Sequence, residues 1–336
     1  MTSNAQTNRE PPMIPVAFST LSCPDWSWRE MIEQGRRHGY DGVEIRLIER
    51  QTDLLQVPEL QPGQLPQRRR ELADVGFQVC GLASSVRFDQ PEPKQREEQQ
   101  RIGRAYIDLA TELGATFVRV FGDTLPANPE ISDDQRIGDG EDSFAPSDRQ
   151  RAVMRQVAEG LDQLGEYAAS RKIEVLIETH GDFIDSRIMQ QTMQMVRCEA
   201  VGVLWDTHHP WRFLGEQPAD SVERLRPWIR HTHWKDSVLR PERRAGDADD
   251  AEVSQAARQA AALMAGHRHA DYVLFGGGEF PAEECLQRLH DCGYDRWYSI
   301  EWEKMWHPEI EDAEIVIPLF PRKIRRMYRS MISGCG

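Results

Sequence analysis

Paired cysteines are the first feature that this sequence lacks. It has six cysteines, and no two of them form a CxxC pair. In a chain of 336 residues, this scatter argues against a disulfide framework and against a zinc ribbon, which both need cysteines at close or regular spacing. We expect reduced thiols without a functional role. The cysteines are Cys23, Cys80, Cys198, Cys285, Cys292 and Cys335.

Long apolar runs are also absent. The first thirteen residues, MTSNAQTNREPPM, are polar and lack the apolar core of a signal peptide, and no later run approaches the length of a membrane span. We therefore expect a cytoplasmic protein that does not contact membranes. Residues 1–13 are expected to be a flexible tail, and 14–336 a single domain.

The chain lacks an excess of basic residues as well. Its formal net charge is -14 and its pI is near 5.3, which counts against a nucleic-acid partner because such a partner needs a basic face. No organic cofactor motif is predicted. The glycines at 276–278 lack the flanking strand and helix of a phosphate loop, so we interpret Tyr272 to Phe280 as a short strand that turns at these glycines.

Four apolar runs do stand out, because each ends in a metal-binding side chain. Each run is typical of a buried strand, and the ligand-type residue falls where the strand would pass into a loop. The runs are IEVLIE, ending at Glu178; VGVLWD, ending at Asp206; IRHTH, ending at His233; and WYSIE, ending at Glu301.

The spacing of these four residues predicts a parallel barrel. Separations of 28, 27 and 68 residues leave room for one helix per step, with an insertion in the last. Earlier strands are expected at Ile14–Thr20, Asp41–Leu47, Gly76–Ser85 and Thr116–Gly122. The fold class is therefore α/β, a (β/α)8 TIM barrel, in which all strands end on one face and the four side chains can meet there.

Helix signals and two long connections complete this pattern. Capping boxes at Ser27 and Ser147 predict helix starts, and a last helix is expected over Pro321–Met331. Long loops follow strand four, at Asp123–Pro146, and strand seven, at Ser237–Tyr272. Each opens on the ligand face, so each is a candidate for closing the pocket; the first could equally be a surface insertion, and the second could instead dock another chain.

The predicted ligands favour one divalent cation. Three carboxylates and one imidazole suit Mn²⁺ best, and Mg²⁺, Co²⁺ and Zn²⁺ are alternatives. Octahedral coordination would leave about two positions for water or substrate oxygens. Such an ion polarises a carbonyl while a proton leaves the neighbouring carbon. Taken singly, each carboxylate could instead be an ordinary salt-bridge partner.

Further polar residues are expected beside this site. His180 lies two residues beyond Glu178, His209 three beyond Asp206, and Lys235 two beyond His233. His180 and His209 are candidate general bases or substrate contacts, because imidazole exchanges protons near neutral pH. Each could instead be a structural histidine. Lys235 could stabilise a developing oxyanion or pair with Asp236.

Several motifs together resemble the xylose isomerase-like TIM-barrel superfamily, in its sugar phosphate isomerase/epimerase branch. The resemblance spans most of the chain. It implies that Glu178, Asp206, His233 and Glu301 bind one divalent metal, usually manganese, and that His209 contacts the substrate. The motifs are GYDGVEIR from Gly39, ETHGD from Glu178, LWDTHHP from Leu204, HTHWKD from His231 and SIEWEKMWHPEIE from Ser299.

One departure from the family pattern bears on the reaction. Ketose 3-epimerases of this superfamily use two glutamates across the sugar; Glu301 matches the first, but Ile184 stands near the place of the second. With His180 present, the chain is more similar to the catalytic subunits of C-glycoside deglycosidases, which cleave 3-oxo-glycosides by elimination. That similarity implies a 3-oxo-sugar or glycoside substrate and a small partner subunit; a homo-oligomer is the alternative assembly.

Three other functions remain to be weighed against elimination. Isomerisation or epimerisation of a ketose or its phosphate would use Glu301 and a histidine as proton carriers. The endonuclease IV branch shares the DxxH pattern of Asp206 and His209, but it needs extra histidines, which strands three and four lack, and this chain is acidic. A barrel that serves as a binding or scaffold subunit would lack a stoichiometric ion.

Overall fold

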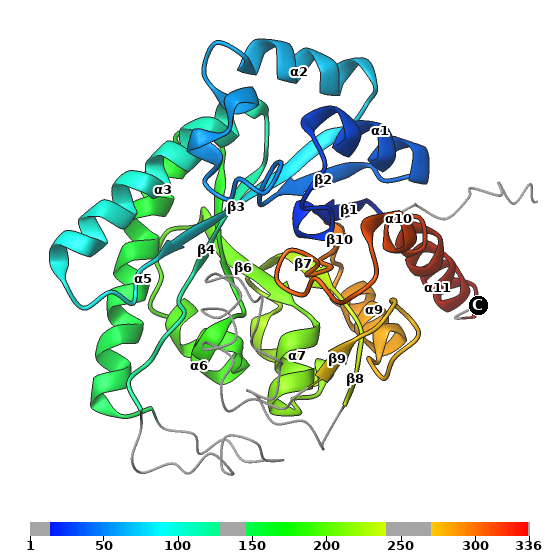
Figure 1. Ribbon diagram of the computed structural model, residues 1–336. Coiled ribbons are helices and arrows are strands. Elements are labelled where there is room, and N and C mark those ends of the chain that lie inside the picture. The colour runs from blue at the N-terminus through cyan, green and yellow to red at the C-terminus, as the bar shows by residue number, and fades with distance from the viewer. Residues whose placement is uncertain (1–13, 128–145, 240–269, 335–336) are drawn as a thin grey trace, which may run out of the picture.

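Eight parallel strands close into a barrel in the computed structural model, which describes residues 14–127, 146–239 and 270–334 (Figure 1). Around the barrel the strand order is β1-β10-β7-β6-β5-β4-β3-β2, and every neighbouring pair is parallel. This confirms the predicted TIM barrel. The strands are β1 Val16–Ser19, β2 Gly42–Ile45, β3 Gln78–Arg87, β4 Phe117–Phe121, β5 Glu174–Glu178, β6 Val201–Asp206, β7 Ile229–Trp234 and β10 Tyr298–Ile300.

Helices form the outer layer of the barrel (Figure 1). Both predicted capping boxes are present, with Ser27 bonded to Glu30 and Ser147 bonded to Gln150. The α-helices are α1 Trp28–His38, α2 Leu65–Asp74, α3 Pro93–Leu113, α5 Asp148–Ala169, α6 Ser186–Met193, α7 Pro218–Leu225, α9 Ala282–Asp291, α10 Ala313–Val316 and α11 Phe320–Gly334. Short helical turns are η1 Thr20–Ser22, η2 Leu54–Gln56, η3 Pro58–Leu60, η4 Gly181–Ile184 and η5 Pro210–Leu214.

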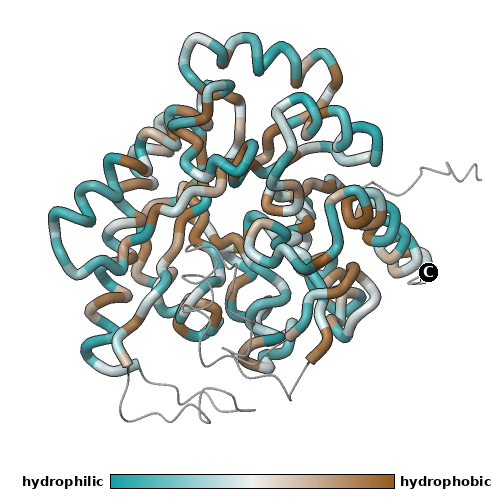
Figure 2. Tube along the Cα trace, in the orientation of Figure 1, coloured by the Kyte–Doolittle hydropathy of each residue, from teal (hydrophilic) through white to brown (hydrophobic). Residues whose placement is uncertain are grey.

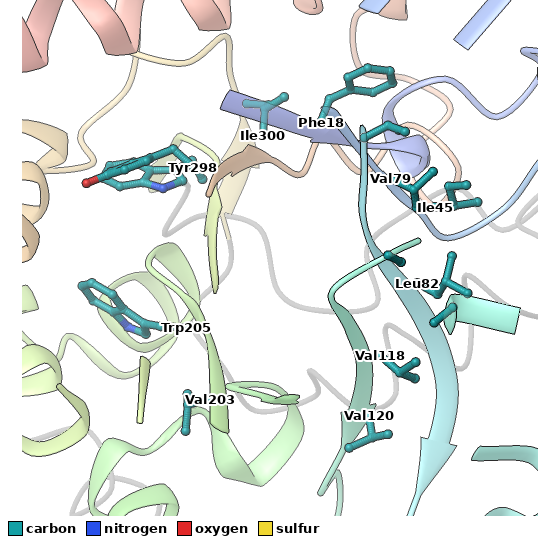
Figure 3. Close-up of a cluster of buried hydrophobic side chains, with 14 of the residues drawn as sticks. Phe18, Ile45, Val79, Leu82, Val118, Val120, Val203, Trp205, Tyr298 and Ile300 are labelled. Carbon is teal, nitrogen blue, oxygen red and sulfur yellow. The ribbon is translucent and has the colours of Figure 1, made fainter. Parts of the chain in front are cut away.

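Side chains along the strands point alternately toward the surrounding helices and into the barrel interior. On β4, Val118 and Val120 belong to the large apolar cluster between strands and helices and lie on one side of the strand, as Figure 3 shows. Phe117 packs inside the barrel with Leu176 and Leu204. Because side chains alternate with a period of two, the next inward positions carry polar groups at the strand ends. Hydrophilic residues dominate the outer turns of the helices (Figure 2).

A small antiparallel sheet stands apart from the barrel after β7. It pairs β8, Ser237–Leu239, with β9, Ala270–Tyr272. The sequence predicted a strand from Tyr272 to Phe280, but the observed strand β9 ends at Tyr272. The Asp236 carboxylate explains this, because it accepts hydrogen bonds from the backbone N–H groups of Gly276, Gly278 and Phe280 at 2.9, 2.9 and 3.0 Å and bends the chain into a turn.

Three expectations fall wholly or largely outside the described residues. These are the N-terminal tail, most of the loop after strand four and most of the insertion after strand seven. The residues outside the description are 1–13, 128–145 and 240–269, respectively. Among the helices in the described part of the chain, none has the length and apolar character needed to cross a membrane.

Candidate metal centre

The barrel brings the four predicted ligands together at the carboxyl ends of its strands. One ligand atom each from Glu178, Asp206, His233 and Glu301 lies within 4.8 Å of all the others, and all four residues are buried. Glu178 and Asp206 end β5 and β6, His233 lies on β7, and Glu301 directly follows β10. Residues up to 123 positions apart thus form one cluster.

His233 directs one ring nitrogen into this cluster. Its Nδ1 lies 3.2 Å from Glu301 Oε2, 3.4 Å from Glu178 Oε1 and 4.0 Å from Asp206 Oδ2. It makes no hydrogen bond. The other nitrogen, Nε2, lies 2.7 Å from the Glu44 carboxylate on β2. A proton on Nε2 would leave the Nδ1 lone pair available to a metal ion.

Asp206 is oriented by the turn that follows its own strand. Its Oδ1 accepts hydrogen bonds from the backbone N–H groups of His208 and His209, at 2.9 and 2.8 Å. Its Oδ2 has no hydrogen bond, although the Lys235 ammonium lies 2.8 Å away as an ion pair. One oxygen is therefore committed to the backbone, and the other faces the cluster.

Glu178 has a buried cation beside it. The Arg119 Nε lies 3.2 Å from Glu178 Oε2, and both side chains are 2% exposed. The Arg119 guanidinium also lies 3.9 Å from the centroid of the Phe121 ring. Burial raises the pKa of Glu178, but the charge of Arg119 and the contact with His233 together outweigh burial, and the net shift is downward. Glu178 is thus held as a carboxylate.

Lys235 occupies the other side of the cluster. Its Nζ donates to Glu301 Oε2 and Glu303 Oε1, both at 2.7 Å, and lies 3.1 Å from His209 Nε2. Glu303 also accepts a hydrogen bond from the Tyr272 hydroxyl at 3.0 Å. Burial lowers the pKa of the ammonium, but Asp206 and the two glutamates outweigh it and hold the pKa well above its usual value. Lys235 is therefore a fixed positive charge.

The donor set fits a divalent cation in both charge and chemistry. Four carboxylates in this pocket contact two permanent cations, so the carboxylates outnumber these cations by two. The buried Asp206 Oδ2 and His233 Nδ1 lack hydrogen bonds, as expected of atoms that ligate a metal ion. The donors are hard oxygens with one imidazole. The carboxylates are Glu178, Asp206, Glu301 and Glu303, and the cations are Arg119 and Lys235.

His180 stands beside the cluster and is hydrogen-bonded to Asp123. Its Nδ1 lies 2.9 Å from Asp123 Oδ1, and its ring centroid lies 4.6 Å from that of Phe121 and 5.8 Å from that of His209. Burial lowers the pKa of His180, but the hydrogen bond and charge of Asp123 reverse the shift. The next residue must be glycine, because a Cβ on Gly181 would stand 2.5 Å from the Asp123 carbonyl oxygen.

Several residues around the centre were not predicted from sequence. They are Glu44 and Arg119 beside the ligands, Asp123 beside His180, and Glu303 beside Lys235. Two had a usable signal, because Glu44 and Arg119 interrupt the apolar strands GVEI and FVRVF at inward positions. Glu303, two residues beyond Glu301, follows the same spacing as Lys235 after His233.

Comparisons with known proteins agree with this architecture. A family model described as "Xylose isomerase-like TIM barrel" matches residues 32–318. An inosose dehydratase of Klebsiella pneumoniae is 27% identical over 233 residues, which is 68% of this chain and 71% of that protein. A 3-dehydroshikimate dehydratase of Bacillus anthracis is 29% identical over 166 residues, 48% of this chain and 52% of that protein.

Two similar solved structures contain a metal. A xylose isomerase-like TIM-barrel protein from Mycobacterium smegmatis in complex with magnesium has a TM-score of 0.62 and 16% identity, over 95% of this chain and 98% of that one. The IOLI protein with a bound zinc atom has a TM-score of 0.65 and 15% identity, over 96% and 99%. At these identities the likeness concerns the fold.

Proposed function

The chain belongs to the xylose isomerase-like TIM-barrel family, and we propose that it is a divalent-metal-dependent carbohydrate enzyme that removes a proton next to a carbonyl. The observation that carries this proposal is the convergence of Glu178, Asp206, Glu301 and the free Nδ1 of His233 within 4.8 Å. These four residues would hold the ion. Mn²⁺ is our first choice, with Mg²⁺, Co²⁺ or Zn²⁺ as alternatives.

The proposed reaction is a β-elimination from a cyclic keto-sugar. When bound, a divalent ion supplies Lewis-acid polarisation of a carbonyl. The Nε2 atom of His180 accepts the proton from the carbon next to that carbonyl, while Asp123 orients the ring through Nδ1. The electron pair of the broken C–H bond forms the carbon–carbon double bond as the leaving group departs, and the leaving group takes up a proton.

Two further residues of this pocket complete the proposed site. Lys235, a buried ammonium between Glu301 and Glu303, places a positive charge where negative charge develops on a substrate oxygen. His209 would contact the substrate, as the family resemblance implies; its ring centroid lies 5.8 Å from that of His180 and 5.5 Å from that of Phe213. Catalysis is thus divided among His180, His209, Lys235 and the metal ligand Glu301.

The substrate we propose is a 3-oxo-sugar or 3-oxo-glycoside, as in C-glycoside deglycosidases. The names of the curated relatives, inosose dehydratase and 3-dehydroshikimate dehydratase, support elimination next to a ring ketone and make water a second candidate leaving group. Both substrates require the same first proton transfer. The small-molecule partner is therefore a cyclic ketone with hydroxyl or glycosyl substituents.

Isomerisation or epimerisation of a ketose is the competing function. It would use Glu301 and a histidine as proton carriers. The position near which a second glutamate would lie holds Ile184, which is 1% exposed, and the following Asp185 is engaged with Arg187 at 2.7 Å. Glu301 is itself bonded to Lys235. These contacts favour elimination over a symmetric two-glutamate exchange.

The domain proposal follows from the length of the chain, and the proposed partner subunit follows from the resemblance. We propose one barrel domain over 14–336, and association with a small partner subunit or a second copy of the chain. Native mass measurement of the purified protein, with and without proteins co-purified from its source, would distinguish a monomer, a homo-oligomer and a complex with a second subunit.

Assays of purified protein with added Mn²⁺ would test the proposed reaction. The assay would compare one 3-oxo-glycoside, one keto-inositol and one free ketose, each labelled with deuterium at the carbon next to the carbonyl. The products would be followed by mass spectrometry and by loss of the deuterium label. We expect loss of the leaving group from at least one of the first two, with release of deuterium. Conversion of the ketose alone to its epimer would overturn elimination in favour of the competing function.

A further inference from the structure

A buried carboxylate links two histidines on the inner side of the candidate metal centre. Glu44 Oε2 lies 2.7 Å from His233 Nε2 and 3.1 Å from His231 Nε2. All three side chains are 0% exposed. Glu44 belongs to β2, which does not neighbour β7 in the barrel, so the contact spans the barrel interior.

This contact determines which nitrogen of His233 can bind a metal. With Nε2 engaged by Glu44, only Nδ1 remains, and it lies 3.2 Å from Glu301 and 3.4 Å from Glu178. A carboxylate that accepts the second N–H of a ligating histidine fixes the tautomer, prevents ring rotation and makes the imidazole a stronger donor. Glu44 is placed to do all three.

His231 in turn fixes Glu44. It lies two residues before His233 on the same strand, so both rings point into the barrel. Its Nε2 contacts the same carboxylate oxygen as His233, while its own Nδ1 has no hydrogen-bond partner. His231 therefore acts as a donor to Glu44 and offers the metal no ligand atom of its own at the outer cluster.

We propose that Glu44 is a positioning residue for the metal ion, acting through His233, and that His231 is its support. The inference rests on the proposed metal site, and it adds a residue that touches neither ion nor substrate. Apolar side chains would fill this part of the barrel interior at a lower free-energy cost than a buried charge. A carboxylate is retained here because it sets the ligand atom of His233.

An experiment has to distinguish this positioning role from a second metal site at the same residues. Glu44, His231 and His233 could themselves hold a second ion, because one ligand atom from each lies within 4.8 Å of the others. The separations of 2.7 and 3.1 Å between the Glu44 oxygen and the two Nε2 atoms are those of hydrogen bonds. Metal stoichiometry distinguishes the two arrangements.

The first test compares two variants that each remove one buried carboxylate. Glu44→Gln replaces the proposed positioning residue. Asp162→Asn is the matched control, because Asp162 is buried and accepts backbone N–H groups of Arg197 and Cys198 far from the centre. Mn²⁺ affinity would be measured by titration calorimetry on metal-free protein, with circular dichroism as a check of folding. We expect affinity to fall about 10- to 100-fold in Glu44→Gln and to stay unchanged in the control.

A second test needs no substitution and covers the case in which Glu44→Gln fails to fold. In full-length protein with ¹⁵N-labelled histidine and bound ¹¹³Cd²⁺, the ring nitrogens report their own state. We expect the proton of His233 on Nε2 and cadmium coupling on Nδ1. Cadmium coupling on His233 Nε2 would overturn the inference.

The remaining outcomes are also decisive. Equal Mn²⁺ affinity in wild type and Glu44→Gln would refute the positioning role while leaving the proposed function intact. Two ions per chain, one of them lost in Glu44→Gln, would make Glu44 a ligand and refute the inference too. No ion bound to the wild type would refute the proposed function itself, which distinguishes that failure from the other two.

Discussion

Asp206 Oδ1 accepts a hydrogen bond of 2.8 Å from the backbone N–H of His209. The turn that holds His209, the proposed substrate contact, thus also holds Asp206, a proposed metal ligand, whose Oδ2 makes no hydrogen bond. We therefore expect metal binding and the position of His209 to be coupled through this short segment.

Replacing Asp206 should remove the ion and the activity together. In Asp206→Ala, the site loses one of three ligand carboxylates and the acceptor for two backbone N–H groups. We expect metal content by inductively coupled plasma analysis to fall far below one ion per chain, and turnover to disappear. Asp162→Asn serves as the control. A variant that keeps its ion and its turnover would show that Asp206 is not a ligand.

Replacing His180 should affect chemistry and leave metal content unchanged. His180 hydrogen-bonds to Asp123 and is not one of the four residues that supply the clustered ligand atoms. Loss of a general base typically lowers turnover about 10²- to 10⁴-fold. We expect that range for kcat in His180→Gln, with one ion still bound. A kcat within a few-fold of wild type would transfer the role of base to another residue.

Replacing Lys235 should separate metal affinity from turnover. Lys235→Met removes a buried positive charge from among Asp206, Glu301 and Glu303. The remaining negative charge should hold a divalent ion as tightly as before or more tightly, while kcat falls about 10²- to 10³-fold. Without metal, unfolding free energy should drop by about 3–5 kcal/mol, because buried carboxylates lose their partner. Weaker metal binding in this variant would argue that Lys235 supports the ligands and not the substrate.

Replacing Asp236 should loosen the glycine turn. Its carboxylate accepts N–H groups of Gly276, Gly278 and Phe280, and buried donors left without a partner cost about 1–3 kcal/mol. We expect denaturant unfolding of Asp236→Ala to show a loss of that size, with faster hydrogen exchange at these three amides. Gly278→Ala should act in the same direction, because its Cβ would stand 2.3 Å from Asp236 Oδ1. Unchanged amide exchange in both variants would contradict this role.

The barrel could be predicted from sequence because its information is local and periodic. Apolar runs mark the strands, and their spacing leaves room for one helix each. The ends of strands five to eight were identified for the same reason, since each run stops at a ligand-type residue such as Glu178. The turn at the glycines was predicted, but the strand before it was placed too late, because β9 ends at Tyr272 and the following chain is bent by Asp236, whose carboxylate contacts residues 40 to 44 positions later.

The contacts on the inner side of the centre could be identified only from the three-dimensional structure. Glu44 contacts His233 from a strand 189 residues earlier, and nothing local indicates which of the barrel's inward positions will face each other. Arg119 was visible as a charge within an apolar strand, but its partner Glu178 depends on the neighbouring strand and on the register between β4 and β5. The four clustered residues could therefore be predicted from the chain, whereas the partners of Glu44 and Arg119 could not.

A crystal of the protein grown with Mn²⁺, with diffraction data collected on both sides of the manganese absorption edge, tests the central claim most directly. The account predicts one anomalous peak per chain, in contact with Glu178, Asp206, Glu301 and the Nδ1 atom of His233. Absence of a peak, or a peak bound by other residues while these four side chains stay paired only with Arg119 and Lys235, would contradict it.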